Sequence, residues 1–245
     1  MTTPQGIRIN TNAKIRRQVI SEDQYCVIVD DFLQHPHDLV EFAADHAGDF
    51  SMPKRGNYPG PIFRVDGDMM TDIYGFIRSR MTKHFPFLRG KMSLWTFLSM
   101  ATVKPGELSY LQRMCHTDPT SAPNRTCYAA LIYLFENESL GGTGFYRWKD
   151  PELVRRAKAI ERRSPGESLP FLQEHFPTYR QPACYMTESN EIAELLRTIP
   201  ARFNRLVFYS GIIPHSASIT APELLSNEFR DGRLTLNIFA DVLPT

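Results

Sequence analysis

The sequence predicts a mainly β protein, a sandwich or barrel supported by helices near its N-terminal end. From Lys91 onward, short runs of β-branched and aromatic residues alternate with turns, which is typical of antiparallel sheets. The first 90 residues instead combine one short apolar strand with two segments of helical periodicity. No linker-like stretch, charge block or repeat divides the chain, so we expect a single domain over residues 1–245. Within it, residues 1–90 form an α/β support and residues 91–245 form the β core.

The N-terminal support contains one predicted strand and two predicted helices. The apolar run YCVIVDDFL at 25–33 indicates a strand, and Pro36 then opens a helix to about residue 47, because proline is tolerated in the first helical turn. Residues 51–63 hold three prolines and two glycines, so we expect a surface loop there. Apolar residues at helical spacing predict a second helix over about 68–85.

The β core is predicted to contain several short strands interrupted by one insertion. The candidate strands cover 93–103, 107–116, 127–136, 143–148, 205–211, 215–219 and 233–243. Between about residues 149 and 200 the composition becomes polar and helical, with predicted helices at 151–163 and 190–199. An insertion between the strands of a barrel usually provides a lid or a wall.

Composition and charge exclude several classes of protein. Lys and Arg total 28 against 27 Asp and Glu, so a formal charge of +1 gives no reason to expect nucleic acid or an anionic membrane as a partner. The longest apolar run, at 127–135, is far shorter than the roughly 20 residues of a membrane-spanning helix. Because the N-terminal segment lacks the apolar core of a secretory signal, we expect a cytoplasmic protein. The four cysteines are widely spaced, which predicts reduced packing residues.

Two histidines and one aspartate form a candidate metal site. His116-Thr117-Asp118 ends one predicted strand, and His215 follows another strand after the turn GIIP. Because alternate residues of a strand share a face, His116 and Asp118 can converge on one ion while Thr117 points away. Two imidazoles and one carboxylate suit one face of an octahedral ferrous ion, leaving three positions for substrate and oxygen. Taken alone, the triplet is better explained by a hydrogen-bonded histidine and a turn aspartate before Pro119, and it is the other motifs that reverse this interpretation.

The last predicted strand alternates strictly between apolar and polar residues. Its even-numbered positions from 234 to 240 are apolar and face one way, whereas Arg233, Thr235 and Asn237 face the other. If this strand lines the mouth of a barrel beside the metal, Arg233 can clamp a carboxylate of a dicarboxylic co-substrate, with Thr235 as an additional donor. Without a metal nearby, such a polar face would simply meet solvent.

The order of these motifs resembles the iron(II)/2-oxoglutarate-dependent oxygenases, in particular a bacterial branch related to prolyl-hydroxylase-like enzymes. The resemblance covers residues 29 to 241 and is specific as an ordered set. It is carried by VDDFL at 29–33, YPGP at 58–61, HTD at 116–118, GGTGFYR at 141–147, NRLVFYSG at 204–211, PHS at 214–216 and RLT at 233–235.

The resemblance implies a double-stranded β-helix core of the jelly-roll or cupin-like type with flanking helices. It also implies Fe(II) as the metal, 2-oxoglutarate as the co-substrate and O2 as the oxidant. The implied iron ligands are His116, Asp118 and His215, and the implied 2-oxoglutarate residues are Arg233, Thr235, Tyr128 and Tyr133. A long gap after His215 leaves Arg230 as a competitor of Arg233, although only Arg233 opens an alternating strand.

The resemblance further implies a hydroxylase, because in halogenating relatives a small residue replaces the carboxylate ligand that Asp118 supplies here. We expect a small-molecule substrate, such as an amino acid or an intermediate of natural product biosynthesis. The oligomeric state is left open, with a homodimer as one alternative. Two other functions stay open: a cupin-like metal enzyme that does not use 2-oxoglutarate, and a non-catalytic jelly-roll binding protein.

Overall fold

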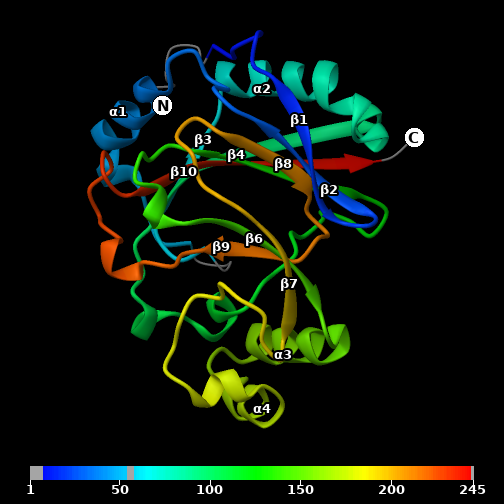
Figure 1. Ribbon diagram of the computed structural model, residues 1–245, viewed down its shortest axis with the longest axis vertical. Coiled ribbons are helices and arrows are strands. Elements are labelled where there is room, and N and C mark those ends of the chain that lie inside the picture. The colour runs from blue at the N-terminus through cyan, green and yellow to red at the C-terminus, as the bar shows by residue number, and fades with distance from the viewer. Residues whose placement is uncertain (1–7, 54–57, 244–245) are drawn as a thin grey trace.

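The computed structural model describes residues 8–53 and 58–243, which form two antiparallel sheets packed face to face (Figure 1). The large sheet has seven strands in the order β1 (Ile15–Ser21), β2 (Gln24–Val29), β8 (Leu206–Ser210), β5 (Thr126–Tyr133), β10 (Arg233–Leu243), β4 (Lys91–Ala101) and β3 (Ile62–Val65). The small sheet has three, in the order β7 (Ala193–Ile199), β6 (Gly142–Trp148) and β9 (His215–Ser218). The fold is a jelly roll with flanking helices, as predicted.

Two helices cover the outer face of the large sheet. These are α1 (Pro36–Asp45), which begins with its proline as predicted, and α2 (Asp68–Arg80). Leu39 of α1 and Ile73 and Ile77 of α2 are almost fully buried in one hydrophobic cluster with the outer side chains of β5, β8 and β10. At the other end of the molecule, α3 (Pro151–Arg163) and α4 (Leu169–His175) lie beside the small sheet (Figure 1).

The predicted alternation of β10 is confirmed. Leu234, Leu236 and Ile238 belong to the cluster under the helices, so the odd-numbered side chains of β10 face the small sheet. We call this side of the large sheet its inner face. Arg233 pairs in register with Ala101 of β4, and the inner face therefore carries the candidate co-substrate residues.

Three predicted elements differ in the structure. Residues 107–116 form no strand. A 3-10 helix at Pro105–Glu107 leads into them, and a second one at Tyr110–Arg113 lies within them, where Ser109 and Gln112 form a capping box that satisfies backbone groups locally. Residues 193–199 form strand β7, not a helix, because pairing with β6 overrides their helical pattern. The predicted loop at 51–63 ends in β3, and Ser51 forms a bridge with Ile62.

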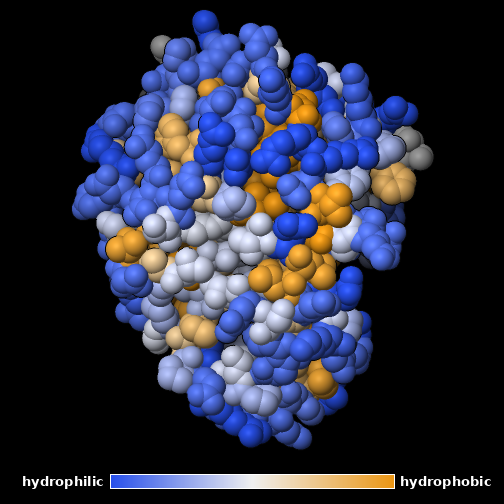
Figure 2. Space-filling view, viewed as in Figure 1, coloured by the Kyte–Doolittle hydropathy of each residue, from blue (hydrophilic) through white to orange (hydrophobic). Residues whose placement is uncertain are grey.

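The edge strands of the two sheets approach each other on one side of the molecule. Ile20 of β1 is buried in the same hydrophobic cluster as the partly buried Leu196 of β7. Figure 2 shows hydrophobic side chains on the surface in this region, and Val19 of β1 is 57% exposed. The sequence patterns above predict neither strand β1 nor helix α4.

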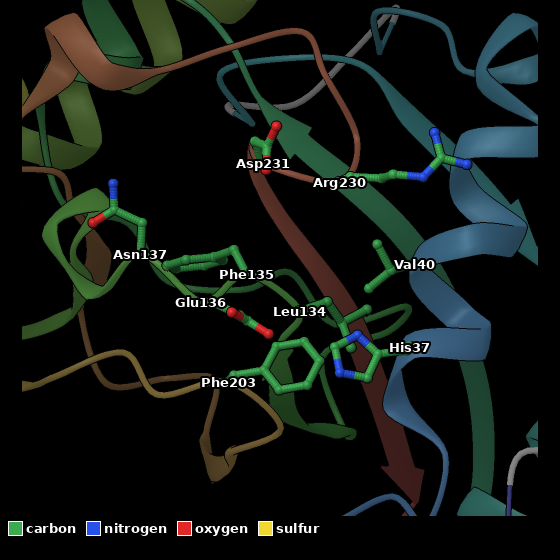
Figure 3. A pocket seen from close by; sticks show the side chains of 9 residues that line it. All are labelled: His37, Val40, Leu134, Phe135, Glu136, Asn137, Phe203, Arg230 and Asp231. Carbon is green, nitrogen blue, oxygen red and sulfur yellow. The ribbon is translucent and has the colours of Figure 1, made fainter.

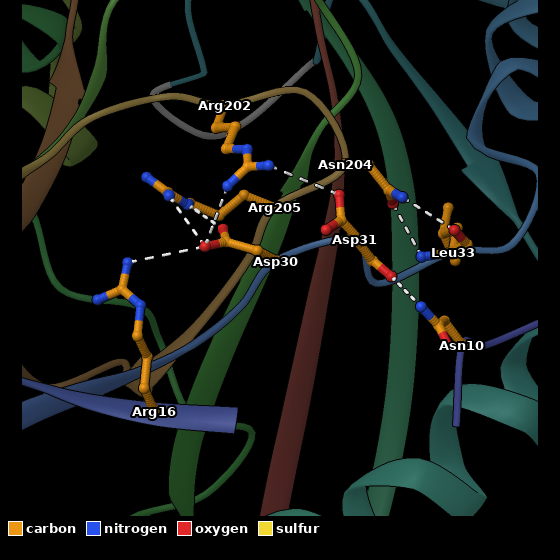
Figure 4. Close-up of polar contacts among 8 residues, drawn as sticks. All are labelled: Asn10, Arg16, Asp30, Asp31, Leu33, Arg202, Asn204 and Arg205. Carbon is orange, nitrogen blue, oxygen red and sulfur yellow. Dashed lines mark hydrogen bonds and ion pairs between the residues drawn. The ribbon is translucent and has the colours of Figure 1, made fainter. Parts of the chain in front are cut away.

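A charged network joins the end of β2 to the segment before β8. Three arginines, Arg16, Arg202 and Arg205, converge on Asp30, and the closest contact is 2.5 Å between Arg205 Nε and Asp30 Oδ1 (Figure 4). Asn204, at a positive φ of 61°, exchanges hydrogen bonds with the backbone of Leu33. These contacts are remote from the candidate metal residues and connect strands that are far apart in the sequence.

Two further predictions concern membranes and thiols. Among the described residues, none of the helices combines the length and apolar character required to cross a membrane. All four cysteines are free, and only Cys184 is exposed. Cys115 is buried and accepts a hydrogen bond from Trp148 Nε1 at 3.1 Å, in agreement with a packing role.

Candidate metal centre

His116 and His215 are adjacent although they are 99 positions apart in the sequence. The backbone N–H of each donates to the carbonyl oxygen of the other, at 2.9 and 2.8 Å, in an isolated antiparallel bridge. Their imidazole rings have centroids 4.5 Å apart. His215 opens β9, so the small sheet holds one of the two candidate ligands and the bridge fixes the other.

Asp118 is held next to the histidines by the end of β8. Its backbone N–H donates to the carbonyl oxygen of Gly211 at 2.8 Å, and Gly211 N–H donates to Cys127 at 2.9 Å. A Cβ atom at position 211 would lie only 2.9 Å from Asp118 Oδ2, so any larger residue there would displace the aspartate side chain. Gly211 is a site residue that sequence reasoning missed; the only signal was its place in the turn before His215.

The three side chains place their donor atoms around one point. Their ligand atoms all lie within 4.8 Å of one another. His215 Nδ1 lies 2.8 Å from the carbonyl oxygen of Ile213, which assigns the hydrogen to Nδ1 and leaves the lone pair of Nε2 directed at the cluster. Asp118 Oδ2 is buried, lies 3.6 Å from this Nε2 and has no hydrogen-bond partner among the described residues. Two buried acceptors that face each other fit a bound cation.

Burial controls the protonation of the cluster. Desolvation, followed by the charges of His215 and Lys158, lowers the pKa of His116 well below its ordinary value. Desolvation raises the pKa of Asp118, and the charge of His215 opposes it. Neutral imidazoles are the form that ligates a metal, and a divalent cation would keep the aspartate ionised. The residues present therefore fit a metal of the ferrous type.

Arg233 is a buried cation on the same inner face. It is 3% exposed, and its guanidinium donates to the carbonyl oxygens of Leu140 and Gly142 at 3.0 and 2.9 Å. Among the described residues it forms no ion pair with a carboxylate, and its charge meets backbone carbonyl oxygens and the ring of Phe135. A buried, unpaired guanidinium is a suitable site for an anion.

Hydroxyl groups surround this guanidinium. Thr235 Oγ1 accepts a hydrogen bond from Asn237 Nδ2 at 3.1 Å and lies 3.4 Å from the phenol oxygen of Tyr58. Burial raises the pKa of Tyr58, and the charge of Arg233 opposes that rise. Burial likewise raises the pKa of Tyr185, whose phenol donates to Val103. Sequence reasoning placed Tyr58 in a surface loop and did not single out Tyr185; the motif YPGP was the only signal.

The two tyrosines predicted to line the pocket lie on opposite faces of β5. Tyr133 is on the inner face, and its phenol oxygen forms a hydrogen bond with the hydroxyl of Thr143 at 2.8 Å. Burial raises the pKa of Tyr133 to about 12, and the hydrogen bond to Thr143 and the charge of Arg233 oppose that rise. Tyr128 points outward into the helical core, where its ring packs on Phe85 and Phe208. The prediction for Tyr128 is therefore wrong, because five positions along a strand reverse the face.

Arg230, the competitor for the anion site, points away from the inner face. Its guanidinium is paired with Glu41 of α1, and both side chains are more than half exposed. It lines a separate cavity of about 270 Å³ beside α1, in which His37 stacks on Phe203 (Figure 3). Phe135 separates this cavity from Arg233, whose guanidinium carbon lies 5.5 Å from the ring centroid.

The fold and this site define a jelly-roll protein with a largely buried cluster of two histidines and one carboxylate. The chain belongs to the family described as "Family of unknown function (DUF6445)", whose model matches residues 11–240. Among curated proteins, no sequence matches it.

Several solved structures are similar in fold at low sequence identity. HygX from Streptomyces hygroscopicus, with nickel and 2-oxoglutarate bound, is 13% identical, with 90% of this chain and 83% of that chain covered and a TM-score of 0.43. The collagen prolyl hydroxylase vCPH of Paramecium Bursaria Chlorella virus-1, a 2-oxoglutarate complex, is 10% identical, with coverage of 90% and 98% and a TM-score of 0.46. A Pseudomonas putida prolyl-4-hydroxylase is 15% identical, with coverage of 91% and 94% and a TM-score of 0.44.

Proposed function

We propose that this protein is an iron(II)- and 2-oxoglutarate-dependent oxygenase that hydroxylates a small molecule. The observation that carries the proposal is the cluster of His116, Asp118 and His215, in which a buried carboxylate oxygen without a hydrogen-bond partner faces the imidazole Nε2 of His215. The buried and unpaired guanidinium of Arg233, on the same inner face, supports a dicarboxylate co-substrate rather than a metal enzyme that works without one.

Each residue of the site has a distinct task in this reaction. His116, Asp118 and His215 would hold the metal, and Arg233 with Thr235 would bind the distal carboxylate of 2-oxoglutarate. The chemistry that ferrous iron supplies when bound is the activation of O2, with conversion of 2-oxoglutarate to succinate and CO2 and insertion of one oxygen atom into a C–H bond. Because Asp118 fills the carboxylate position, a halide has no ligand site to take, which favours hydroxylation over halogenation.

The inner face also offers an apolar surface for the substrate. Trp95 and Phe97 of β4 and Phe239 of β10 are partly exposed, and we call these three residues the aromatic shelf. The rings of Trp95 and Phe239 are stacked with centroids 6.2 Å apart. In the register of the sheet, Phe239 and Tyr209 both pair with Ala129, which places the shelf in the same row as the ring that contacts His215. Aromatic walls of this kind suit a small molecule with an apolar ring or chain.

Succinate formation tests the proposal. Purified protein supplied with ferrous iron, 2-oxoglutarate and a panel of ring-bearing amino acids and natural-product intermediates should release succinate, and Asp118→Ala should lose both iron and succinate. Trp95→Ala should raise the KM for the substrate about tenfold or more, while the Kd for 2-oxoglutarate stays unchanged, since the shelf lies apart from Arg233.

Two results would contradict the proposal. Oxygen consumption without any need for 2-oxoglutarate, unaffected by Arg233→Lys, would favour a cupin-like metal enzyme. If the wild-type protein binds no iron and the His116→Ala variant has the same phenotype as the wild type, a non-catalytic binding protein would be favoured.

A further inference from the structure

A second buried carboxylate lies outside the metal centre, near the end of β10. Asp241 is only 1% exposed, and its Oδ2 accepts a hydrogen bond from the hydroxyl of Ser121 and an ion-pair contact from Arg125 Nε at 2.5 Å. Arg125 Nη2 also donates to the backbone oxygen of Asp241 at 2.8 Å. A buried carboxylate is costly for the folded state, so its contacts call for an explanation.

Both partners of Asp241 belong to the segment that carries a metal ligand. Residues 119–125 connect Asp118 to β5, and Ser121 follows Asp118 by three positions. On its other side, Asp118 is attached to Gly211, which is bonded to Cys127, and Cys127 is the register partner of Asp241. Asp118 is therefore connected to the large sheet on both sides. Gly211 and Cys127 connect it on one side, and Ser121 and Arg125 connect it to Asp241 on the other.

The carboxylate of Asp118 has little to orient it directly. Its Oδ2 has no hydrogen-bond partner, so its direction is set by the position of its backbone. The following segment is largely exposed and forms no regular element, and such segments move unless they are tied to the core. The contacts of Ser121 and Arg125 with Asp241, together with a longer hydrogen bond from Arg125 Nη2 to the carbonyl oxygen of Lys91 at 3.4 Å, tie it to the large sheet.

We infer that Asp241, Arg125 and Ser121 form a positioning group that fixes the metal-binding geometry of Asp118. The inference rests on the proposed function, because it assumes that Asp118 binds a metal. It does not assume turnover, 2-oxoglutarate or any substrate. Groups that orient a ligand from behind typically change metal affinity by about ten- to a hundredfold when they are mutated.

Cobalt(II) binding to the full-length protein tests this inference. Asp241→Asn keeps the size of the side chain and removes its charge, and the cobalt Kd, followed by the d–d absorption of the bound ion, should rise about tenfold or more. Hydrogen exchange in residues 119–125 should accelerate in the same variant. Asp30→Asn is the matched control, because Asp30 pairs with a buried arginine at the same distance of 2.5 Å but far from the metal ligands. It should lower the melting temperature and leave the cobalt Kd within about twofold of the wild-type value.

The possible results separate the inference from the proposed function. An Asp241→Asn protein that binds cobalt as tightly as wild type, or an Asp30→Asn protein that loses the same affinity, would overturn the inference alone. Wild-type protein that binds no cobalt would overturn the proposed function and the inference with it. If Asp241→Asn does not fold, Ser121→Ala decides: it removes one hydroxyl from an exposed residue, and an unchanged Kd and exchange rate would overturn the inference.

Discussion

Replacement of Arg233 by lysine should weaken the binding of 2-oxoglutarate far more than it weakens the fold. Lysine keeps the charge but lacks the planar fork that lets one side chain bond to Leu140 and Gly142 and still clamp a carboxylate. The loss of one hydrogen bond to a charged group is worth about 1.5–3 kcal/mol. Since 1.4 kcal/mol corresponds to a factor of ten, the Kd for 2-oxoglutarate should rise roughly 10- to 150-fold.

The assay is a titration of iron-loaded protein with 2-oxoglutarate in the absence of oxygen, followed by the charge-transfer absorption of the complex. Arg230→Lys is the matched control, because Arg230 is three positions away but exposed and paired with Glu41. Its Kd should equal that of the wild type. The assignment of Arg233 as the anion site would be refuted if Arg233→Lys bound 2-oxoglutarate with the wild-type Kd. It would also be refuted if both variants lost the same affinity for 2-oxoglutarate.

Three further predictions follow from particular contacts. Gly211→Ala places a methyl group 2.9 Å from Asp118 Oδ2 and should weaken cobalt binding at least about tenfold with the fold retained, as checked by titration and circular dichroism; unaltered binding would contradict this steric argument. Tyr133→Phe should weaken 2-oxoglutarate binding several-fold, whereas Tyr128→Phe, on the other face, should leave the Kd unchanged; equal Kd values in the two variants would show that the face does not matter. Burial alone would raise the pKa of Asp30, but the hydrogen bond and charges of its arginines outweigh burial and lower it. This stabilisation is therefore complete above the unfolded pKa of about 3.9 and is lost as the pH falls through the lower folded value. Asp30→Asn should remove that acid dependence from the unfolding free energy measured with urea, and an identical pH profile would be evidence against the ion pair.

Much of the fold follows from local patterns in the chain. The alternation of β10 predicts both its bounds and its two faces, and Pro36 and Pro151 mark the starts of α1 and α3, because these signals lie within a few residues of one another. The segment at 193–199 shows where local reasoning fails. Its pattern fits a helix, but its backbone hydrogen bonds are made with β6, and pairing across that distance is invisible to a short window.

The sequence by itself determined which residues could bind a metal and an anion. His116, Asp118 and His215 were identifiable from their types, their spacing and the order of the motifs around them, and Arg233 from its place at the start of an alternating strand. Only the tertiary structure decided that these three side chains meet, that Arg233 rather than Arg230 is buried without an acidic partner, and that Tyr128 faces the helices. The physical reason is that residue type and periodicity are properties of neighbours along the chain, whereas burial, ion pairing and ligand distance arise when strands distant in sequence pack together.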